Sequence, residues 1–293
     1  MIAPVEPSKE DCCNSGCNPC IFDVYEKQLK LYEKLKDSNE NVEKENDNGI
    51  LQLEYTIFVV TEIFNVCTSH KIIKFKRKVD GHRVWWKPGD HFFVLYKSKS
   101  IKCSRAYTPI KLKQQEHNNF DFSIVVKKYS NGLVSNYLFN LVEGDFTYWR
   151  GPCDSYEVTP NKYDNIIMVA QGTGIAPFMS IIESILLNED DLTKIILYFC
   201  CQSIETILFR EELYAYKSYW NFKYEVYLSK CLLEVDIKYE EPIINRRLNF
   251  EDIKQYPQKN KNQYLVCGSN AFMEHYKSQF LSQNVPSENI KLF

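Results

Sequence analysis

The sequence lacks the usual marks of a secreted, membrane-spanning or nucleic-acid-binding chain. No apolar run approaches the roughly 20 residues that span a bilayer, so we expect no integral membrane segment. A formal net charge of −2 gives no electrostatic reason to expect nucleic acid as a partner. The first residues, Met1-Ile2-Ala3-Pro4, show neither a signal peptide nor the second-position glycine that myristoylation requires. These absences predict a soluble, intracellular and cytoplasmic protein.

A catalytic triad, histidine-rich metal spacing and internal repeats are also missing from the sequence. Aromatic residues, by contrast, make up 14% of the chain and provide bulky material for a core. The length of 293 residues suits about two domains. Composition changes near residues 50 and 158, which separates a short N-terminal part from two longer regions.

The N-terminal part combines a cysteine cluster with a helical pattern. Apolar residues between Phe22 and Leu35 recur at three- and four-residue spacing, which predicts one amphipathic helix. Residues 37–50 are mostly polar and charged, a composition typical of a linker. We therefore expect a cysteine-rich helical segment over 1–36 and a linker over 37–50.

The two longer regions differ in rhythm. Residues 51–158 contain β-branched and aromatic runs at 55–60, 91–95 and 120–125, which predict a small antiparallel β-barrel with one short helix near 134–141. Residues 159–293 alternate strands with helices, which predicts a doubly wound parallel sheet. The fold class is thus an α+β barrel domain followed by an α/β domain. The expected strands of the second region are 166–170, 194–200, 223–228 and 263–267, and its helices begin near Ile175, Thr206, Phe250 and Ala271.

The segment Arg105-Ala106-Tyr107-Thr108 places a fixed cation, an aromatic ring and a hydroxyl within four residues. The arginine fork suits a phosphate or pyrophosphate, the tyrosine ring suits a flat heterocycle, and the threonine can hydrogen-bond a ring edge. An ordinary strand with an exposed arginine is the alternative.

Further along, Gly132 permits a tight turn, and Ser135 is expected to begin a helix whose N–H groups face a phosphate. A turn followed by an N-cap is the alternative here.

Glycines and a proline follow the strand at 166–170, in the run Gly172-Thr173-Gly174-Ile175-Ala176-Pro177. The glycines allow the backbone to approach a ligand, although the pattern is not the G-x-G-x-x-G dinucleotide fingerprint. Cys267-Gly268-Ser269 repeats the arrangement of strand, small turn and helix. A cysteine there can touch a nicotinamide ring or simply fill a strand end. The order of the motifs therefore predicts a flavin site followed by a nicotinamide-nucleotide site.

Seven short motifs follow one another along the chain: Pro88-Gly89-Asp90-His91, Arg105–Ile110, Val126-Lys127, Gly132–Ser135, Arg150-Gly151-Pro152, Gly172–Pro177 and Cys267-Gly268. In this order they resemble the ferredoxin-reductase superfamily, and within it the NADH–cytochrome b5 reductase group, over roughly residues 52–293. Some members of that group also open with an oxidoreductase-like cysteine motif.

The resemblance implies FAD and NADH as cofactors, with Thr108 and Cys267 as catalytic residues. It assigns to FAD the residues Arg105, Ala106, Tyr107, Thr108, Val125, Val126, Lys127, Gly132, Leu133, Val134 and Ser135, with Thr173 close by, and to NADH Gly172, Thr173, Gly174, Pro177 and Gly268, with Lys127 near its phosphates. Hydride would pass from NADH to FAD, and single electrons would then reach a small haem acceptor such as cytochrome b5. The chain departs from the group's pattern at Gln171, where a small residue is usual, and after Gly268, where prolines are usual.

The cysteines Cys12, Cys13, Cys17 and Cys20 allow three interpretations. They can form a structural or partner-docking element, a metal site, or a redox dithiol at a helix start. We assign no metal to them. A second hypothesis for the whole chain follows, namely a weakly catalytic flavin-fold protein that senses redox state or binds partners through these cysteines.

Lys74, Lys76 and Lys78 alternate along an expected strand and share one face. An acidic haem protein could dock on this face, and an ordinary solvated barrel face is the alternative.

Overall fold

The computed structural model describes residues 4, 6–7, 21–37, 48–79, 81–115, 119–153, 156–230, 237–253 and 261–293. The chain divides into two compact units. Unit 1 comprises residues 1–64, 71–111 and 115–155, and unit 2 comprises residues 65–70, 112–114 and 156–293. Each unit is described separately.

Unit 1 is built on a six-stranded sheet with the order β4-β3-β6-β1-β2-β5. Its strands are β1 (Thr56–Cys67), β2 (His70–Arg77), β3 (His91–Lys97), β4 (Lys102–Tyr107), β5 (Phe122–Lys127) and β6 (Phe146–Cys153). The three strands expected from the sequence in this region are confirmed, with shifted ends. β3 pairs antiparallel with β4 and β6, and β6 pairs antiparallel with β1.

The predicted barrel is only partly closed. β4 and β5 are the two edges of the sheet, and an isolated bridge between Ile110 and Ser123 joins the chain after β4 to β5. Backbone bonds run both ways across this bridge at 2.8 Å. Inside, aromatic side chains dominate: the fully buried Trp149 contacts Phe75 and Phe122 edge to face. Such aromatic packing explains why this region of the sequence is so rich in rings.

Helix α1 (Ile21–Asp37) confirms the predicted N-terminal helix. Its buried Gln28 accepts a hydrogen bond from Arg150 at 3.1 Å and donates one to the Gln52 carbonyl at 3.4 Å. The Arg150 guanidinium lies over the rings of Tyr55 and Phe93, at 5.5 and 5.3 Å from their centroids. Polar contacts therefore attach α1 to β6 and to the segment that precedes β1.

Residues 48–50, at the end of the predicted linker, hydrogen-bond into the sheet domain. The Asn48 amide donates to the Trp85 carbonyl at 2.7 Å, and its oxygen accepts from the Trp85 N–H at 3.2 Å. Gly49 N–H donates to the Arg83 carbonyl at 3.0 Å, and Ile50 is only 1% exposed in the core.

Helix α2 (Leu133–Phe139) corrects one expectation about its start. Gly132 is the N-cap, and Ser135 lies inside the first turn, where its Oγ donates to the Gly132 carbonyl at 3.1 Å. The buried Val134 and Leu138 face the core, and this packing sets the helix start one turn earlier than a serine N-cap would.

Unit 2 is a parallel sheet with the order β10-β9-β8-β7-β11-β12, in which all five neighbouring pairs run parallel. Its strands are β7 (Asn165–Gln171), β8 (Lys194–Cys201), β9 (Phe222–Leu228), β10 (Ile243–Ile244), β11 (Asn262–Cys267) and β12 (Ile290–Leu292). The four strands expected from the sequence are confirmed. Both faces are buried, as the continuous apolar runs require.

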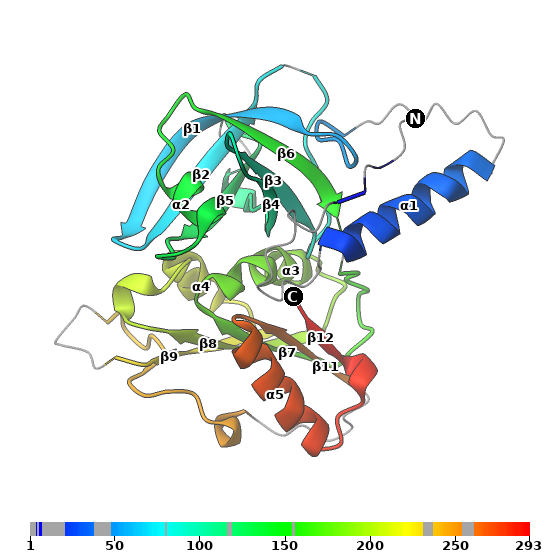
Figure 1. Cartoon of the computed structure of the whole chain (residues 1–293). Helices are drawn as coiled ribbons and strands as arrows, with labels where there is room; N and C mark the ends of the chain where they lie inside the picture. The colour runs from blue at the N-terminus through cyan, green and yellow to red at the C-terminus, as the bar shows by residue number, and fades with distance from the viewer. Residues whose placement is uncertain are drawn as a thin grey trace. The chain divides into compact units, whose positions relative to one another are not determined.

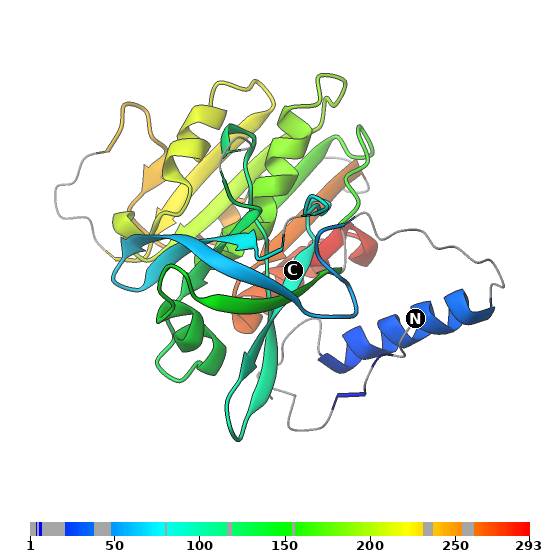
Figure 2. The same cartoon turned by 90° about the horizontal axis from the view of Figure 1, so that it is seen from above.

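Helices cover the two faces of this sheet. Helix α5 (Asn270–Ser282) packs Met273, Tyr276 and Phe280 onto a cluster that includes Ile167 and Val266. Helices α3 (Ala176–Leu186) and α4 (Arg210–Tyr216) lie side by side over the opposite face (Figures 1 and 2). This is the doubly wound arrangement that the alternating pattern predicts.

Two helix starts differ from the expectation. Near Thr206 the chain forms one 3₁₀ turn, Ile204–Thr206, and α4 begins only at Arg210. Near Phe250 the described residues form a single 3₁₀ turn, Phe250–Asp252. Here Asp252 hydrogen-bonds Asn249 N–H at 2.8 Å, which favours a capped turn.

Candidate functional site

Strand β4 presents the predicted flavin residues at its end. Arg105 and Tyr107 are two positions apart, opposite Val94 and Phe92 of β3, so they share one side of the strand. The Arg105 guanidinium donates to the Ser104 carbonyl at 2.7 Å. Thr108 follows Tyr107, the last residue of the strand, and precedes Pro109.

The Tyr107 hydroxyl lies in an electrostatic cluster of its own unit. Burial raises the pKa of the phenol, the neighbouring Tyr129 raises it further, and the Arg105 guanidinium lowers it. The ring packs edge-on against Trp149, with centroids 6.2 Å apart. Tyr107 therefore stays protonated at neutral pH and is available as a hydrogen-bond donor.

Lys127 connects this cluster to the end of β5. Its ammonium lies 5.5 Å from the centroid of the Tyr129 ring, while Val125 and Val126 before it are buried in unit 1. The valines thus contribute backbone alone to any ligand. Tyr129 is therefore a shared neighbour of Tyr107, through electrostatics, and of Lys127, through its ring.

Gly132 is closely surrounded by its neighbours. A Cβ on Gly132 would lie 2.3 Å from Ser135 Oγ and 3.1 Å from Tyr129 Cβ. The predicted residues of this turn differ in exposure: Leu133 is exposed, whereas Val134 and Ser135 are buried. Ser135 is already bonded to the Gly132 carbonyl, so its hydroxyl shapes the turn.

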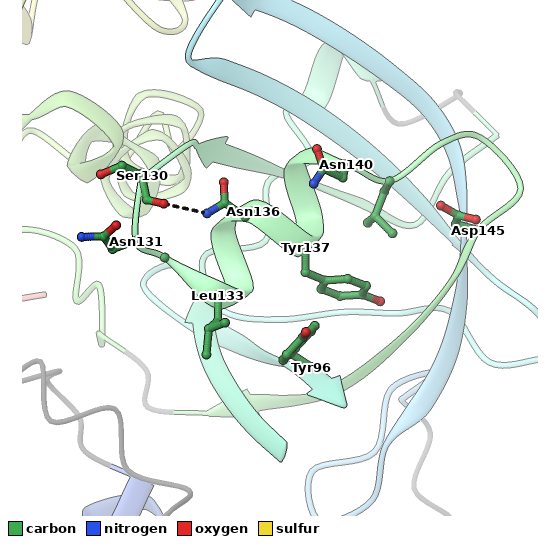
Figure 3. Close-up of a pocket in the computed structure, with 10 residues that line it drawn as sticks. Tyr96, Ser130, Asn131, Leu133, Asn136, Tyr137, Asn140 and Asp145 are labelled. Atoms are coloured by element: carbon green, nitrogen blue, oxygen red, sulfur yellow. Dashed lines mark hydrogen bonds between the residues drawn. The ribbon is translucent and has the colours of Figure 1, made fainter. Parts of the chain in front are cut away.

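A cavity of about 540 Å³ opens beside this turn and along α2 (Figure 3). That volume falls within the range of small-molecule sites. Asn136, which lines the cavity, donates to the carbonyls of Tyr129 and Ser130, at 2.9 and 3.4 Å. The lining residues are Tyr96, Ser130, Asn131, Gly132, Leu133, Asn136, Tyr137, Asn140, Leu141 and Asp145.

Most of the residues that line this cavity were missed by the sequence reasoning. Leu133, Asn136, Tyr137 and Asn140 follow one another at three-, one- and three-residue steps, the spacing of one helix face. That periodicity was a usable signal. Tyr96, on β3, had none, because its place beside the Tyr137 ring, 5.4 Å away, depends on the tertiary fold.

In unit 2 the predicted nicotinamide residues form two turns at the carboxyl ends of neighbouring strands. β7 ends at Gln171 and β11 ends at Cys267, whose strand register places Cys267 opposite Ala170. The first turn, Gly172–Ile175, is a 3₁₀ turn that leads into α3, with Pro177 in the first turn of that helix. Open parallel sheets bind their ligands at this edge.

The glycines of these turns serve different purposes. Gly172 has a φ of +54°, and among the described residues no atom lies within 4 Å of where its Cβ would be. This backbone faces open space that a dinucleotide can enter. At Gly174, by contrast, a Cβ would lie 2.4 Å from the Cys267 carbonyl oxygen. The two turns are therefore in direct backbone contact, and Gly174 leaves room for the Cys267 carbonyl, whereas the expectation was that it leaves room for a ligand.

The Cys267 thiol is protonated. Burial raises its pKa to about 12, and its Sγ donates to the carbonyl of Phe293 at 3.7 Å. The Phe293 ring in turn packs against Tyr156 and Phe178. The cysteine is thus a neutral, oriented group at the strand end, unsuited to act as a base.

Two other predicted features were the lysine stripe of unit 1 and the N-terminal cysteine cluster. Lys74 is paired with Glu62 at 2.9 Å, and its side chain is only 13% exposed, which removes it from the expected stripe of free surface charge. Lys76 hydrogen-bonds Asn119 at 2.5 Å. The cysteines Cys12, Cys13, Cys17 and Cys20 lie outside the described residues.

Comparisons with known proteins agree with this architecture. Residues 57–158 match the family described as "Oxidoreductase FAD-binding domain", residues 168–278 match "Oxidoreductase NAD-binding domain", and residues 2–41 match "Oxidoreductase-like protein, N-terminal". The two units therefore define a flavin- and nicotinamide-dependent oxidoreductase. The helices of the described residues give no candidate for a membrane span.

The relatives narrow the class. A mouse (Mus musculus) protein named "NADH-cytochrome b5 reductase-like" is 30% identical over 307 residues, which cover 100% of this chain and 95% of the relative. The human (Homo sapiens) protein of the same name is 28% identical, with the same coverage. The chain belongs to the NADH-cytochrome b5 reductase-like family. It is an NADH-dependent flavoprotein reductase, with FAD and NADH as its cofactors.

Solved structures share the fold. The cytochrome b5 reductase domain of Ulva prolifera nitrate reductase has a TM-score of 0.68 at 22% identity and covers 84% of this chain and 100% of its own. The CS-b5R domains of human Ncb5or in the NAD+ form also have a TM-score of 0.68, at 19% identity, and cover 85% of this chain and 71% of their own.

Proposed function

We propose that this chain accepts hydride from NADH onto FAD and passes single electrons to a small haem protein of the cytochrome b5 type. The observation that carries the proposal is the pair of turns in unit 2, where Gly174 touches the Cys267 carbonyl at the edge of a parallel sheet. The relatives' names, NADH-cytochrome b5 reductase and reductase-like, supply the acceptor class.

In unit 1 we assign the flavin site to the end of β4 and to the Gly132 turn. Arg105 offers a planar fork for the pyrophosphate, and the protonated Tyr107 hydroxyl donates to the ribityl chain. Thr108 hydrogen-bonds the edge of the reacting ring. Bound FAD supplies the exchange between two-electron and one-electron chemistry, and the protein supplies orientation and electrostatics.

In unit 2 we assign NADH to the open backbone at Gly172–Pro177 and to Cys267–Gly268. The N–H groups of the 3₁₀ turn and of α3 face the nucleotide's phosphates. The neutral Cys267 thiol gives the nicotinamide ring a small contact surface without adding charge. Thr173 and Lys127 are expected to approach the cofactors from their own units.

The test is an anaerobic titration of the purified protein with NADH. We expect a yellow protein whose flavin absorbance bleaches with one equivalent of NADH, and whose electrons then reduce added cytochrome b5. A colourless protein, or a yellow one that NADH does not bleach, would support the weakly catalytic redox-sensing hypothesis instead.

We predict that NADH is preferred over NADPH. The loop after β8 carries the exposed Glu205, which repels a 2′-phosphate. Arg210, the nearest arginine, is held by the buried Glu241, to which its Nε donates at 2.6 Å. Burial raises the pKa of Glu241, but the hydrogen bonds and charges of Arg210 and Lys238 outweigh it and lower this pKa overall, so the carboxylate stays charged. We expect kcat/KM for NADH to exceed that for NADPH by at least about tenfold, since one charge-assisted contact is worth about 1.5–3 kcal/mol.

The matched variants for this prediction are Glu205→Gln and Lys230→Ala. Lys230 N–H donates to the Gln202 carbonyl at 2.9 Å, which places this lysine's backbone against the same loop. Glu205→Gln should lower the ratio of kcat/KM for NADH to kcat/KM for NADPH, because it removes the charge that repels the 2′-phosphate. Equal kcat/KM for NADH and NADPH in the wild type would contradict the prediction. If Lys230→Ala then lowered kcat/KM for NADPH alone, Lys230 would be identified as the partner of the 2′-phosphate.

We also predict that residues 1–47 are dispensable for electron transfer from NADH to ferricyanide. Every residue assigned to a cofactor follows residue 100. The cut falls before Asn48 because residues 48–50 hydrogen-bond into unit 1. We expect ferricyanide turnover within about threefold of the full chain at equal FAD content, because α1 is attached through polar contacts of about 1 kcal/mol each.

The control for this truncation is a full-length variant with Cys12, Cys13, Cys17 and Cys20 replaced by serine. Loss of most ferricyanide turnover in both proteins would place the cysteines in the electron path. Loss in the truncated protein alone would mean that α1 completes the fold of unit 1.

A further inference from the structure

Gln171, the last residue of β7, bridges the two nucleotide turns of unit 2 through its side chain. Its Oε1 accepts the Ser269 Oγ–H at 2.9 Å and the Ser269 N–H at 3.2 Å. Both donors belong to a residue 98 positions away in the sequence. One amide oxygen thus joins the end of β7 to the chain that follows β11, and we call this pair the Gln171–Ser269 clasp.

The clasp sits where the two turns already touch. A Cβ on Gly268 would lie 2.8 Å from Gln171 Cβ and 2.8 Å from the Phe272 ring. Only glycine at 268 lets the Gln171 stem pass this close. A Cβ on Gly174 would lie 2.4 Å from the Cys267 carbonyl oxygen. Residues 267–269 therefore lie close to both the glycine turn and the Gln171 side chain.

The Ser269 side chain does not cap helix α5, although its position would allow it to. It is the N-cap residue of α5, where a serine hydroxyl usually accepts from an N–H of the first helical turn. Within the described part of the chain its side chain makes no such cap bond. The hydroxyl donates to Gln171 instead. The hydrogen bond to Gln171 at the end of β7 therefore replaces the capping bond that a serine usually makes at a helix start.

We propose that Gln171 is a positioning residue for hydride transfer: the clasp sets the place of the Cys267–Gly268 turn against the Gly172–Gly174 turn, and hence the angle at which the nicotinamide is presented. This deepens the proposed function and rests on it. Gln171 should affect the position of the nicotinamide more than the affinity for the nucleotide. Its accepting oxygen is already bonded to Ser269, so we do not assign it a bond to the nucleotide.

Three substitutions separate hydrogen bonding from bulk. Gln171→Ala removes the clasp and the stem, Gln171→Met keeps the stem and removes the acceptor, and Gln171→Glu keeps an acceptor for both Ser269 donors. Gln171 is exposed at a strand end, so all three variants should fold. The measurements are the limiting rate of flavin reduction by NADH, from anaerobic rapid mixing, and the Kd for NAD+.

We expect Gln171→Ala and Gln171→Met to lower the limiting rate about tenfold, because a small misplacement of a reacting group costs up to about 100-fold in rate. The Kd for NAD+ should change less than about twofold, and Gln171→Glu should recover most of the rate. Recovery by Gln171→Met, or a loss carried by Kd alone, would overturn the positioning role.

The Ser269 partner gives a second test. Ser269→Ala keeps the N–H bond and loses the hydroxyl bond, so the rate should fall by less than in Gln171→Ala. The double variant should be no slower than Gln171→Ala, since contacting residues are not additive. Additive losses would mean that the two side chains act separately, and the clasp would be rejected.

Hydrogen exchange tests the clasp without any turnover. The Ser269 N–H should exchange at least about tenfold faster in Gln171→Ala and Gln171→Met than in the wild type or Gln171→Glu, because its acceptor is gone. Unchanged exchange would show that the clasp does not hold the turn. If the clasp is present by exchange but the wild-type flavin is not bleached by NADH, the proposed function fails and the clasp stands as a structural contact only.

Discussion

The Arg105→Ala protein is expected to purify without most of its FAD, whereas the wild type purifies yellow. Arg105 is the fixed cation at the end of β4, beside the Tyr107 hydroxyl. Two charge-assisted hydrogen bonds from a guanidinium to a pyrophosphate are worth about 1.5–3 kcal/mol each. Their loss should raise the Kd for FAD on the order of 100- to 10,000-fold. The measurement is the flavin-to-protein absorbance ratio, followed by titration with added FAD.

Two variants control this result. Lys102→Ala removes an exposed cation from the start of the same strand and should keep full FAD occupancy. Arg105→Lys keeps the charge and loses the planar fork, so its affinity should fall between the two. Full occupancy in Arg105→Ala would show that the pyrophosphate lies elsewhere, and the cavity beside α2 would then become the first place to examine.

The Gly174→Ala protein should keep its FAD and lose NADH-driven flavin reduction by about 100-fold or more. The new Cβ would lie 2.4 Å from the Cys267 carbonyl oxygen and 3.0 Å from the Gly268 nitrogen. These are backbone atoms, which cannot swing aside as a side-chain end can. One turn must therefore shift, and a shift near 1 Å costs about 100-fold in rate when it misplaces a reacting group.

The matched control is Gly144→Ala in unit 1. Gly144 has a φ of +92°, and the described residues leave no atom within 4 Å of its Cβ position. Alanine there carries a backbone strain of about 1–2 kcal/mol, which lowers stability without touching a nicotinamide turn. Gly144→Ala should thus reduce flavin at the wild-type rate. A Gly174→Ala rate within about threefold of the wild type would disprove the close-contact argument.

Local patterns were enough to predict most elements of this fold. Apolar and β-branched runs predicted the strands of both units, since a strand buried on both faces needs such residues whatever its neighbours are. These patterns were less informative about where helices begin and where short 3₁₀ turns form. Near Phe250 a single bond from the Asn249 N–H to the Asp252 carboxylate favours a 3₁₀ turn, and α4 starts only at Arg210, after Phe209 adopts a left-handed conformation with a φ of 55°.

The candidate site shows the same division. The residue types of Arg105, Tyr107 and the two glycine turns were readable from the sequence, because their chemistry is local. The lining of the cavity by Tyr96 was not, since it depends on β3 reaching α2. Nor was the loss of Lys74 from the charged stripe, because Glu62 reaches it across a hairpin.

By itself, the sequence determined the class of protein, through its resemblance to a known family, the order of its two units and the residue types that we assign to the cofactors. It did so because glycine, proline, arginine and apolar periodicity impose their effects within a few residues. Only the tertiary structure decided that Asn48 bonds Trp85, 37 positions away, and that Gln171 holds Ser269, 98 positions away. Contacts between distant residues depend on which strands become neighbours, and β7 and β11 meet only once the whole sheet has formed.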